Sequence, residues 1–221
     1  MAAPLSGRQA EARRNDSLIL EAAREVFVED PDAPISLVAE RAGVGIGALY
    51  RRYASKEDLL RQLCSEGLRR YVAEAEAALA DEDDPWAAFA DFMCRIVDAD
   101  THSLTLRLAG TFTPTEELYR DSRKAQELNL RLFERTKTAG AIRPDVVVDD
   151  LSLLFEQVAA VRIGDEERTH QLRRRYLALL LDALRVPLGS PLPGPPPSWG
   201  EISRRWENQP SPRSHETRGR S

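Results

Sequence analysis

The stretch that most restricts the fold is residues 38–60, VAERAGVGIGALYRRYASKEDLL. Its pattern predicts a helix, a tight turn at Gly43, a second short helix and a third helix capped by Ser55. Glycine supplies the positive φ that such a turn needs. Val44 and Leu49 are expected to face inward and to hold this hairpin, residues 36–52, against the preceding helix.

The hairpin is locally cationic, although the chain as a whole has a net charge of −5. Residues 41–56 contain Arg41, Arg51, Arg52 and Lys56 and no acidic side chain. The acidic excess lies in residues 71–186, which carry 15 basic and 22 acidic residues. An acidic body repels DNA, so only the hairpin is expected to approach a duplex. A compact helical hairpin with a cationic exposed face is what a DNA-reading element requires.

The rest of the chain has apolar residues at helical spacing, which predicts an all-α fold of about nine helices. Asp16 is expected to cap the first helix, Ser36 the second, and Gly140 to end a long later helix. The expected helices span about 17–30, 36–43, 46–52, 56–79, 85–97, 104–112, 115–138, 149–163 and 167–186.

Four regions follow from these patterns. They are a flexible N-terminal arm (1–11), a helix-turn-helix DNA-binding domain (12–70), a helical effector-binding and dimerisation domain (71–186) and a disordered tail (187–221). The tail holds eight prolines and few aliphatic residues, so it is not expected to form a core. Basic residues near the N-terminus (Arg8, Arg13 and Arg14) either enter a minor groove or are simply solvated.

Several function classes are disfavoured. The sequence contains no paired carboxylates, no nucleophile–base pair and no phosphate-binding loop, so no catalytic residue, metal site or cofactor is expected, and His102 and His170 stand apart from other ligand types. No apolar run approaches the roughly 20 residues of a membrane-spanning helix. Cys64 and Cys94 are too few for a disulfide framework, and the expected location is the cytoplasm.

The segment AERAGVGIGALYRRYASKEDLL resembles the DNA-binding region of TetR-family transcriptional regulators. The shared pattern is a small-residue helix, AGV, a recognition helix that ends in LY, a following aromatic residue and a capped lysine. The resemblance covers about residues 12–70. Beyond residue 70 the chain is similar to the family in its helical layout and length.

The resemblance implies a set of DNA-binding residues. Tyr50, Lys56 and Ser36 would bind phosphates, Arg51 and Arg52 would follow the groove edge, and Ile46 and Gly47 would face the bases. The expected site comprises Ser36, Gly45, Ile46, Gly47, Ala48, Tyr50, Arg51, Arg52, Tyr53 and Lys56. Gly45 and Ala48 stand where the family often has hydroxyl residues, so the reading face lacks hydrogen-bonding side chains. We therefore expect thymine methyl contacts and DNA shape to contribute strongly to discrimination.

The second domain has an aromatic stripe that is either a plain core or the lining of a cavity. Similarity to the family favours a pocket for a small apolar or amphipathic effector, with Arg107, Asn129 or Arg162 as polar contacts. The candidate lining residues are Trp86, Phe89, Met93, Leu108, Phe112, Phe133 and Phe155.

The last two helices, residues 149–186, are the expected homodimer interface. A twofold dimer would place two recognition helices about one DNA turn (~34–36 Å) apart. The resulting prediction is a regulator, most simply a repressor that an effector releases from a palindromic double-stranded operator. The alternatives are a constitutive DNA-binding protein without an effector, and a helical enzyme.

Overall fold

The computed structural model describes residues 7–100, 112–186 and 190–202. Within these ranges the regular secondary structure is α-helical, as the sequence predicts. An isolated antiparallel β-bridge pairs Ile142 with Arg185. None of the helices in the described ranges is long and apolar enough to cross a membrane. The helices are α1 (Gly7–Glu29), α2 (Ile35–Arg41), α3 (Ile46–Arg52), α4 (Lys56–Ala80), α5 (Pro85–Asp98), α7 (Glu116–Thr138), α8 (Val148–Ala159) and α9 (Glu166–Leu184).

Several helix ends follow directly from local side-chain chemistry. Ser55, Asp84 and Thr115 accept backbone N–H bonds at the starts of α4, α5 and α7. Pro85 is the first residue of α5, where its missing N–H costs nothing. Gly140 has φ 72° just after α7 ends, which confirms the predicted stop.

Three helix boundaries differ from the expectation. Helix α1 begins at Gly7, so residues 7–11 are helical rather than an arm, and Asp16 lies inside the helix instead of capping it. Helix α2 has Pro34 at its N-cap, and Ser36 lies in its first turn. Helix α8 ends at Ala159 instead of near residue 163, ahead of a turn in which Gly164 has φ 74°. The helix expected at 104–112 falls almost wholly outside the described residues.

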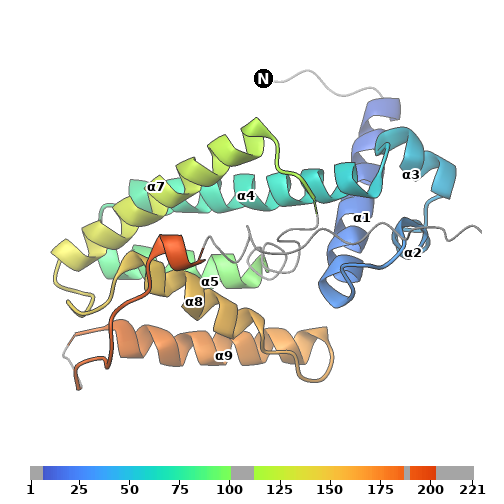
Figure 1. The fold of residues 1–221 in the computed structure, drawn as a ribbon. Helices are drawn as coiled ribbons and strands as arrows, with labels where there is room; N and C mark the ends of the chain where they lie inside the picture. The colour runs from blue at the N-terminus through green and yellow to red at the C-terminus, as the bar shows by residue number, and fades with distance from the viewer. Residues whose placement is uncertain (1–6, 101–111, 187–189, 203–221) are drawn as a thin grey trace, which may run out of the picture.

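Two hydrophobic clusters share α4 (Figure 1). Helices α1, α2 and α3 lie at one end of the molecule around the first half of α4, and α5, α7, α8 and α9 surround its second half. The first cluster includes Ile19, Val26, Phe27, Val38, Leu49, Leu59, Leu60 and Leu63. The second includes Phe89, Phe92, Met93, Ile96, Leu132, Phe133, Leu151, Phe155 and Leu177.

Part of the predicted tail packs onto the body. The Arg143 guanidinium donates to the carbonyl of Ser190 at 2.8 Å, and the N–H of Leu192 donates to Asp145 at 3.0 Å. Ile202 is only 6% exposed. The prediction that the whole tail, residues 187–221, is disordered is therefore wrong for residues 190–202. The paired side chains of Arg143 and Asp145 supply hydrogen-bond partners for the proline-rich backbone.

Candidate nucleic-acid interface

The hairpin is a tight turn between two seven-residue helices. Gly43 has φ 66°, and the N–H of Val44 donates to the carbonyl of Ala39 at 3.0 Å. Gly45 is the N-cap of α3 and offers no side-chain hydrogen bond. At the start of α3 the N–H groups of Ala48 and Leu49 donate to the Gly45 carbonyl.

One face of α3 is open to solvent. Leu49 is fully buried and anchors the helix, whereas Ile46 is 43% and Tyr50 50% exposed. A Cβ atom added at Gly47 would meet no neighbouring heavy atom of the described residues within 4 Å. Ile46 and Tyr50 are one helical turn apart, as are Gly47 and Arg51, so the four share an outward surface. Ala48 is half-buried, and Ser36 is exposed on α2.

The cations of the hairpin are held unequally, because acids from α1 reach them. Arg41 pairs with Glu25 at 2.7 Å, and Arg52 Nε donates to Asp16 Oδ1 at 2.6 Å. Arg51 is exposed and makes no ion pair within the described part of the chain. The cationic surface predicted from residues 41–56 is therefore partly neutralised by residues far away in sequence.

Lys56 is committed to the protein's own backbone. Its ammonium donates to the carbonyls of Pro31 at 2.7 Å and Ala33 at 2.8 Å, and lies 5.0 Å from the centre of the Phe27 ring. Burial lowers the pKa of Lys56. Two of its three N–H donors are used in holding the loop after α1, so at most one is left for the phosphate contact that the resemblance implies.

Tyr53 does not belong to the exposed surface. It is 5% exposed and packs in the first cluster, where burial raises its pKa to about 12. The Arg52 guanidinium lies 5.5 Å from the centre of its ring. The Tyr53 hydroxyl makes no hydrogen bond within the described residues. Including Tyr53 among residues that touch DNA was wrong, because the aromatic ring anchors the end of α3 in the core.

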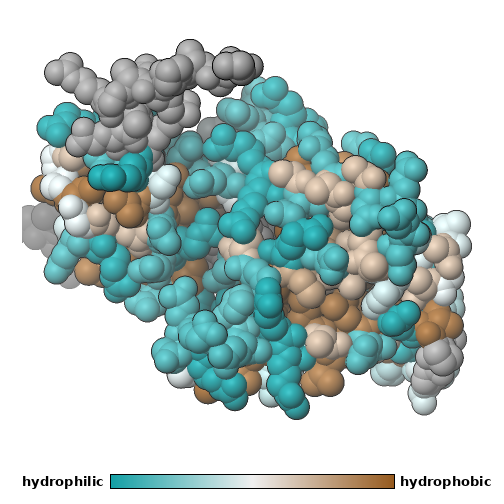
Figure 2. All heavy atoms as spheres, turned by 180° about the vertical axis from the view of Figure 1, so that it is seen from behind, coloured by the Kyte–Doolittle hydropathy of each residue, from teal (hydrophilic) through white to brown (hydrophobic). Residues whose placement is uncertain are grey.

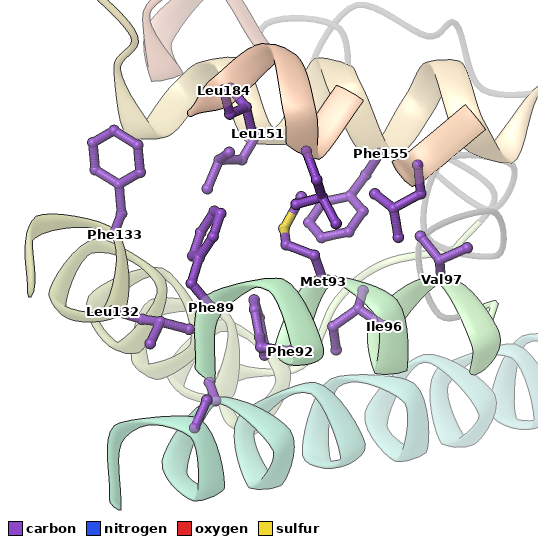
Figure 3. Close-up of a cluster of buried hydrophobic side chains, with 14 of the residues drawn as sticks. Phe89, Phe92, Met93, Ile96, Val97, Leu132, Phe133, Leu151, Phe155 and Leu184 are labelled. Carbon is purple, nitrogen blue, oxygen red and sulfur yellow. The ribbon is translucent and has the colours of Figure 1, made fainter. Parts of the chain in front are cut away.

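Four of the predicted pocket residues gather in the second cluster (Figure 3). Phe89 and Met93 of α5, Phe133 of α7 and Phe155 of α8 are each at most 3% exposed. Trp86 lies partly buried at the edge of the cluster, with its ring 5.9 Å from that of Phe89. In the part of the chain that the structure describes, these side chains pack against one another in a hydrophobic core.

Two predicted lining residues are not in this cluster. Phe112 packs against the first cluster, around α1 and α4, because the chain has returned to the other end of α4 at this point. Leu108 lies outside the described residues.

A small cavity of about 10 Å³, with room for about one water, lies among residues of the second cluster, including Ile96 and Val97. Phe155, Val158 and Arg173 are among its lining residues. The Arg173 guanidinium is already bonded to the carbonyls of Ala159 and Val161 and to Asp100.

Polar contacts tie the two halves of the molecule together. Arg24 of α1 donates to the carbonyl of Ala99 at 2.9 Å, just after α5. The Glu57 carboxylate accepts a hydrogen bond from the N–H of Thr113 at 3.0 Å. Arg61 Nε donates to the carbonyl of Thr113 at 3.0 Å. Partners 52 to 75 residues apart carry no local sequence signal, which is why sequence reasoning missed Arg24, Glu57 and Arg61.

Large apolar side chains remain exposed on α9 and in the turn between α8 and α9. Ile163 is 61%, Tyr176 46% and Leu179 56% exposed. Figure 2 shows apolar side chains among hydrophilic ones on the surface of the C-terminal half. Ile163, Tyr176 and Leu179 lie within residues 149–186, the segment expected to dimerise.

Comparison with known proteins gives two family matches. Residues 19–63 match the family described as bacterial regulatory proteins of the tetR family, and residues 84–186 match the C-terminal domain of SbtR-like transcriptional regulators. No curated protein gives a significant match.

Solved structures of similar fold extend over most of the chain. A TetR transcription regulatory protein from Mycobacterium vanbaalenii is 27% identical with a TM-score of 0.53, covering 80% of this chain and 99% of that chain. A TetR regulator from Streptomyces coelicolor is 26% identical with a TM-score of 0.54, covering 77% and 98%. The regulator LfrR from Mycobacterium smegmatis, solved with proflavine, is 22% identical with a TM-score of 0.56, covers 75% and 95%, and shares the fold.

Proposed function

The chain belongs to the TetR family of DNA-binding transcriptional regulators, and we propose that it is a homodimeric repressor released from a palindromic operator by a small effector. Effector-controlled repression is typical of this family. The observation that carries the proposal for this chain is the open face of α3, held at the end of the molecule by the buried Leu49. Its place of action is the cytoplasm, where bacterial DNA lies.

The proposed DNA contacts follow from exposure and charge. Ile46 and Gly47 present an apolar, uncrowded surface that fits thymine methyls in a major groove. Tyr50 and Arg51 lie on the same outward side and have hydrogen-bonding groups for phosphates or base edges. Because no polar side chain stands between Gly45 and Ala48, DNA shape contributes to the choice of site.

The proposed dimer uses exposed apolar residues of α9, with α8 packed beside it. Tyr176 and Leu179 lie one helical turn apart on α9 and are both about half exposed. Two helices from each copy can form a four-helix bundle around a twofold axis. Such an axis explains why the operator should be a palindrome.

The proposed effector binds in the second domain and is apolar or amphipathic. The aromatic and aliphatic side chains around Phe89, Met93 and Phe155 supply the surface for such a ligand. They are closely packed here, so an effector that enters among them must displace some of them. The energy of binding is then coupled to movement of α5, α7 and α8.

DNA selection tests the proposal. Purified full-length protein is incubated with random duplexes, and the retained fragments are sequenced. An inverted repeat with half-sites about one helical turn (~34–36 Å) apart is expected. A tandem or asymmetric motif would contradict the dimer, and the absence of any enriched motif would contradict sequence-specific binding.

The burial of Phe89, Met93, Phe133 and Phe155 in a hydrophobic cluster of the described residues also fits one alternative, a constitutive DNA-binding protein without an effector. A thermal-shift screen with the selected operator separates the two. A ligand that raises the unfolding midpoint and releases the operator supports regulation by an effector. Ligands that stabilise the protein without affecting operator binding, or none at all, support the constitutive alternative.

A further inference from the structure

Arg52 is fixed to the first helix by a bond that the sequence does not suggest. Its Nε donates to Asp16 Oδ1 at 2.6 Å, and its guanidinium lies 5.5 Å from the centre of the Tyr53 ring. The Arg52 side chain is 56% exposed, whereas that of Asp16 is 23% exposed. The carboxylate is thus the more sheltered partner, and the arginine extends outward from it.

The bond to Asp16 leaves the two terminal nitrogens of the Arg52 guanidinium available for other hydrogen bonds. It occupies Nε, and the two terminal nitrogens make no hydrogen bond within the described residues. These nitrogens form the fork with which arginine grips a phosphate or a guanine edge. Arg52 is in the last turn of α3, three residues from the buried Leu49, so the fork lies on the flank of the open face.

Arg51 provides the contrast. It neighbours Arg52 but makes no ion pair within the described residues, so its side chain can sample many orientations and attract any phosphate. Arg52 has less freedom to lose when it binds, because Asp16 and Tyr53 already restrict it. The negative charge of Asp16 also reduces the attraction of the hairpin for DNA in general.

We propose that Asp16 is a positioning residue for DNA recognition, which orients Arg52 toward one contact in the operator and weakens binding to other DNA. The inference rests on the proposed DNA-binding function and assigns to α1 a role in specificity. Asp16 contributes to the ratio of operator to non-operator affinity without touching a base.

The test compares affinities of the full-length protein for its selected operator and for a scrambled duplex of equal length and composition. Asp16→Asn removes the charge and keeps the shape. It should tighten binding to scrambled DNA about two- to fivefold, as expected for releasing a surface ion pair. The salt dependence of that binding should steepen by about one unit of log–log slope, because Arg52 becomes an additional free cation. The operator-to-scrambled ratio should fall correspondingly.

Glu21→Gln is the matched control. Glu21 is exposed on the same helix and makes no ion pair within the described residues, so this variant has the same charge change without releasing an arginine. It should leave the ratio unchanged. Equal effects of the two variants would show that Asp16 acts only through net charge and would overturn the proposal.

A double-mutant cycle with Arg52→Gln tests whether Asp16 acts through Arg52. In that background Asp16→Asn should no longer change the ratio, and a full effect there would overturn the proposal. If Asp16→Asn does not fold, Asp16→Glu serves instead; the longer side chain keeps the charge but shifts the guanidinium, so the ratio should fall without tighter binding to scrambled DNA. A wild-type protein that selects no operator would refute the proposed function, whereas normal selection with an unchanged ratio in the Asp16 variants would refute this inference alone.

Discussion

At the scale of single residues, Ile46 is the aliphatic side chain that α3 presents for base recognition in the proposed complex. Ile46 is 43% exposed and next to a glycine. We expect Ile46→Ala to change the preferred base at one or two operator positions, each by about 1 kcal/mol, because a methyl contact is lost while phosphate contacts remain. Parallel DNA selections with the two proteins measure this. Identical motifs would contradict a base-reading role for Ile46.

Lys56 is expected to matter for stability as well as for DNA binding. In Lys56→Met the carbonyls of Pro31 and Ala33 and the ring of Phe27 lose their contact with the ammonium group, while most of the aliphatic side chain is kept. The free energy of unfolding should fall by about 1–2 kcal/mol, measured by urea denaturation. If Lys56 also contacts a phosphate, all DNA sites should weaken alike, with a shallower salt dependence.

Arg51→Met is the control for Lys56→Met, since Arg51 is exposed and unpaired within the described residues. It should change the free energy of unfolding by no more than about 0.5 kcal/mol. Equal stability of both variants and the wild type would mean that the Lys56 bonds contribute nothing net.

Residues that act on their near neighbours were predictable from sequence, and residues that act at a distance were not. Ser55 caps α4 and Gly43 makes the turn because both roles depend on a few adjacent residues. Asp16 was interpreted as a helix cap, but its partner Arg52 is 36 residues away. Tyr53 was placed on the DNA surface because a motif fixes neighbours along the chain and leaves the burial of each side chain open.

At the scale of elements, an ion cluster joins α5 to α9. Asp98 at the end of α5 accepts hydrogen bonds from the Arg174 guanidinium and lies 3.0 Å from His170 Nε2. The bond from Arg174 lowers the pKa of Asp98, and the charge of His170 acts in the same direction. A carboxyl whose pKa is lower in the folded than in the unfolded protein stabilises the fold when ionised.

Asp98→Asn should therefore lower the thermal unfolding midpoint at pH 7. As the pH falls below the unfolded pKa of about 3.9, the wild-type advantage should decline, and it should vanish once the folded carboxyl is protonated. Thermal melts between pH 2 and 7 measure the difference. Asp91→Asn, an exposed acid on the same helix, is the control. A difference between Asp98→Asn and the wild type that does not depend on pH would contradict an electrostatic role.

Helix boundaries show the same limit of sequence reasoning. The starts of α5 and α7 were predicted correctly from Asp84, Pro85 and Thr115, because helix capping depends on neighbouring residues. The first turns of α1 have no apolar stripe to reveal them, so the predicted start at residue 17 is ten residues too late. Helix α8 was extended too far because apolar residues continue past its end at Ala159.

At the scale of the whole molecule, the proposed dimer makes a direct prediction. Leu179→Arg places a charge in the centre of the exposed apolar surface of α9, where Leu179 is 56% exposed. The variant should sediment as a folded monomer and lose at least about tenfold in operator affinity, since each half-site then binds alone. Leu130→Arg, at a 45% exposed leucine of α7, is the control and should remain dimeric. A dimeric Leu179→Arg protein would place the interface elsewhere.

The general layout of the molecule was predictable, whereas the state of its core was not. The helical spacing of apolar residues recurs along most of the chain and predicts the all-α fold. The hairpin motif combines many adjacent residues and indicates the family. Whether Phe89 and Phe155 line a cavity or pack in a core depends on how helices from distant segments meet, and within the described residues both are buried in the second cluster. Phe112 was assigned to the wrong cluster for the same reason.

The sharing of α4 between both clusters has a mechanical consequence. Its 25 residues make a rod of about 38 Å, with one end among α1–α3 and the other beside α5 and α7. A tilt of about 5° around its far end displaces Lys56 by about 3 Å, a geometric estimate from the rise per residue. Applied in opposite senses in a twofold dimer, it changes the separation of the two α3 helices by up to about 6 Å, a sixth of the ~34–36 Å between successive major grooves. In the proposed dimer, a core that yields by a few degrees would therefore move the two α3 helices out of register with their half-sites while every helix stays intact.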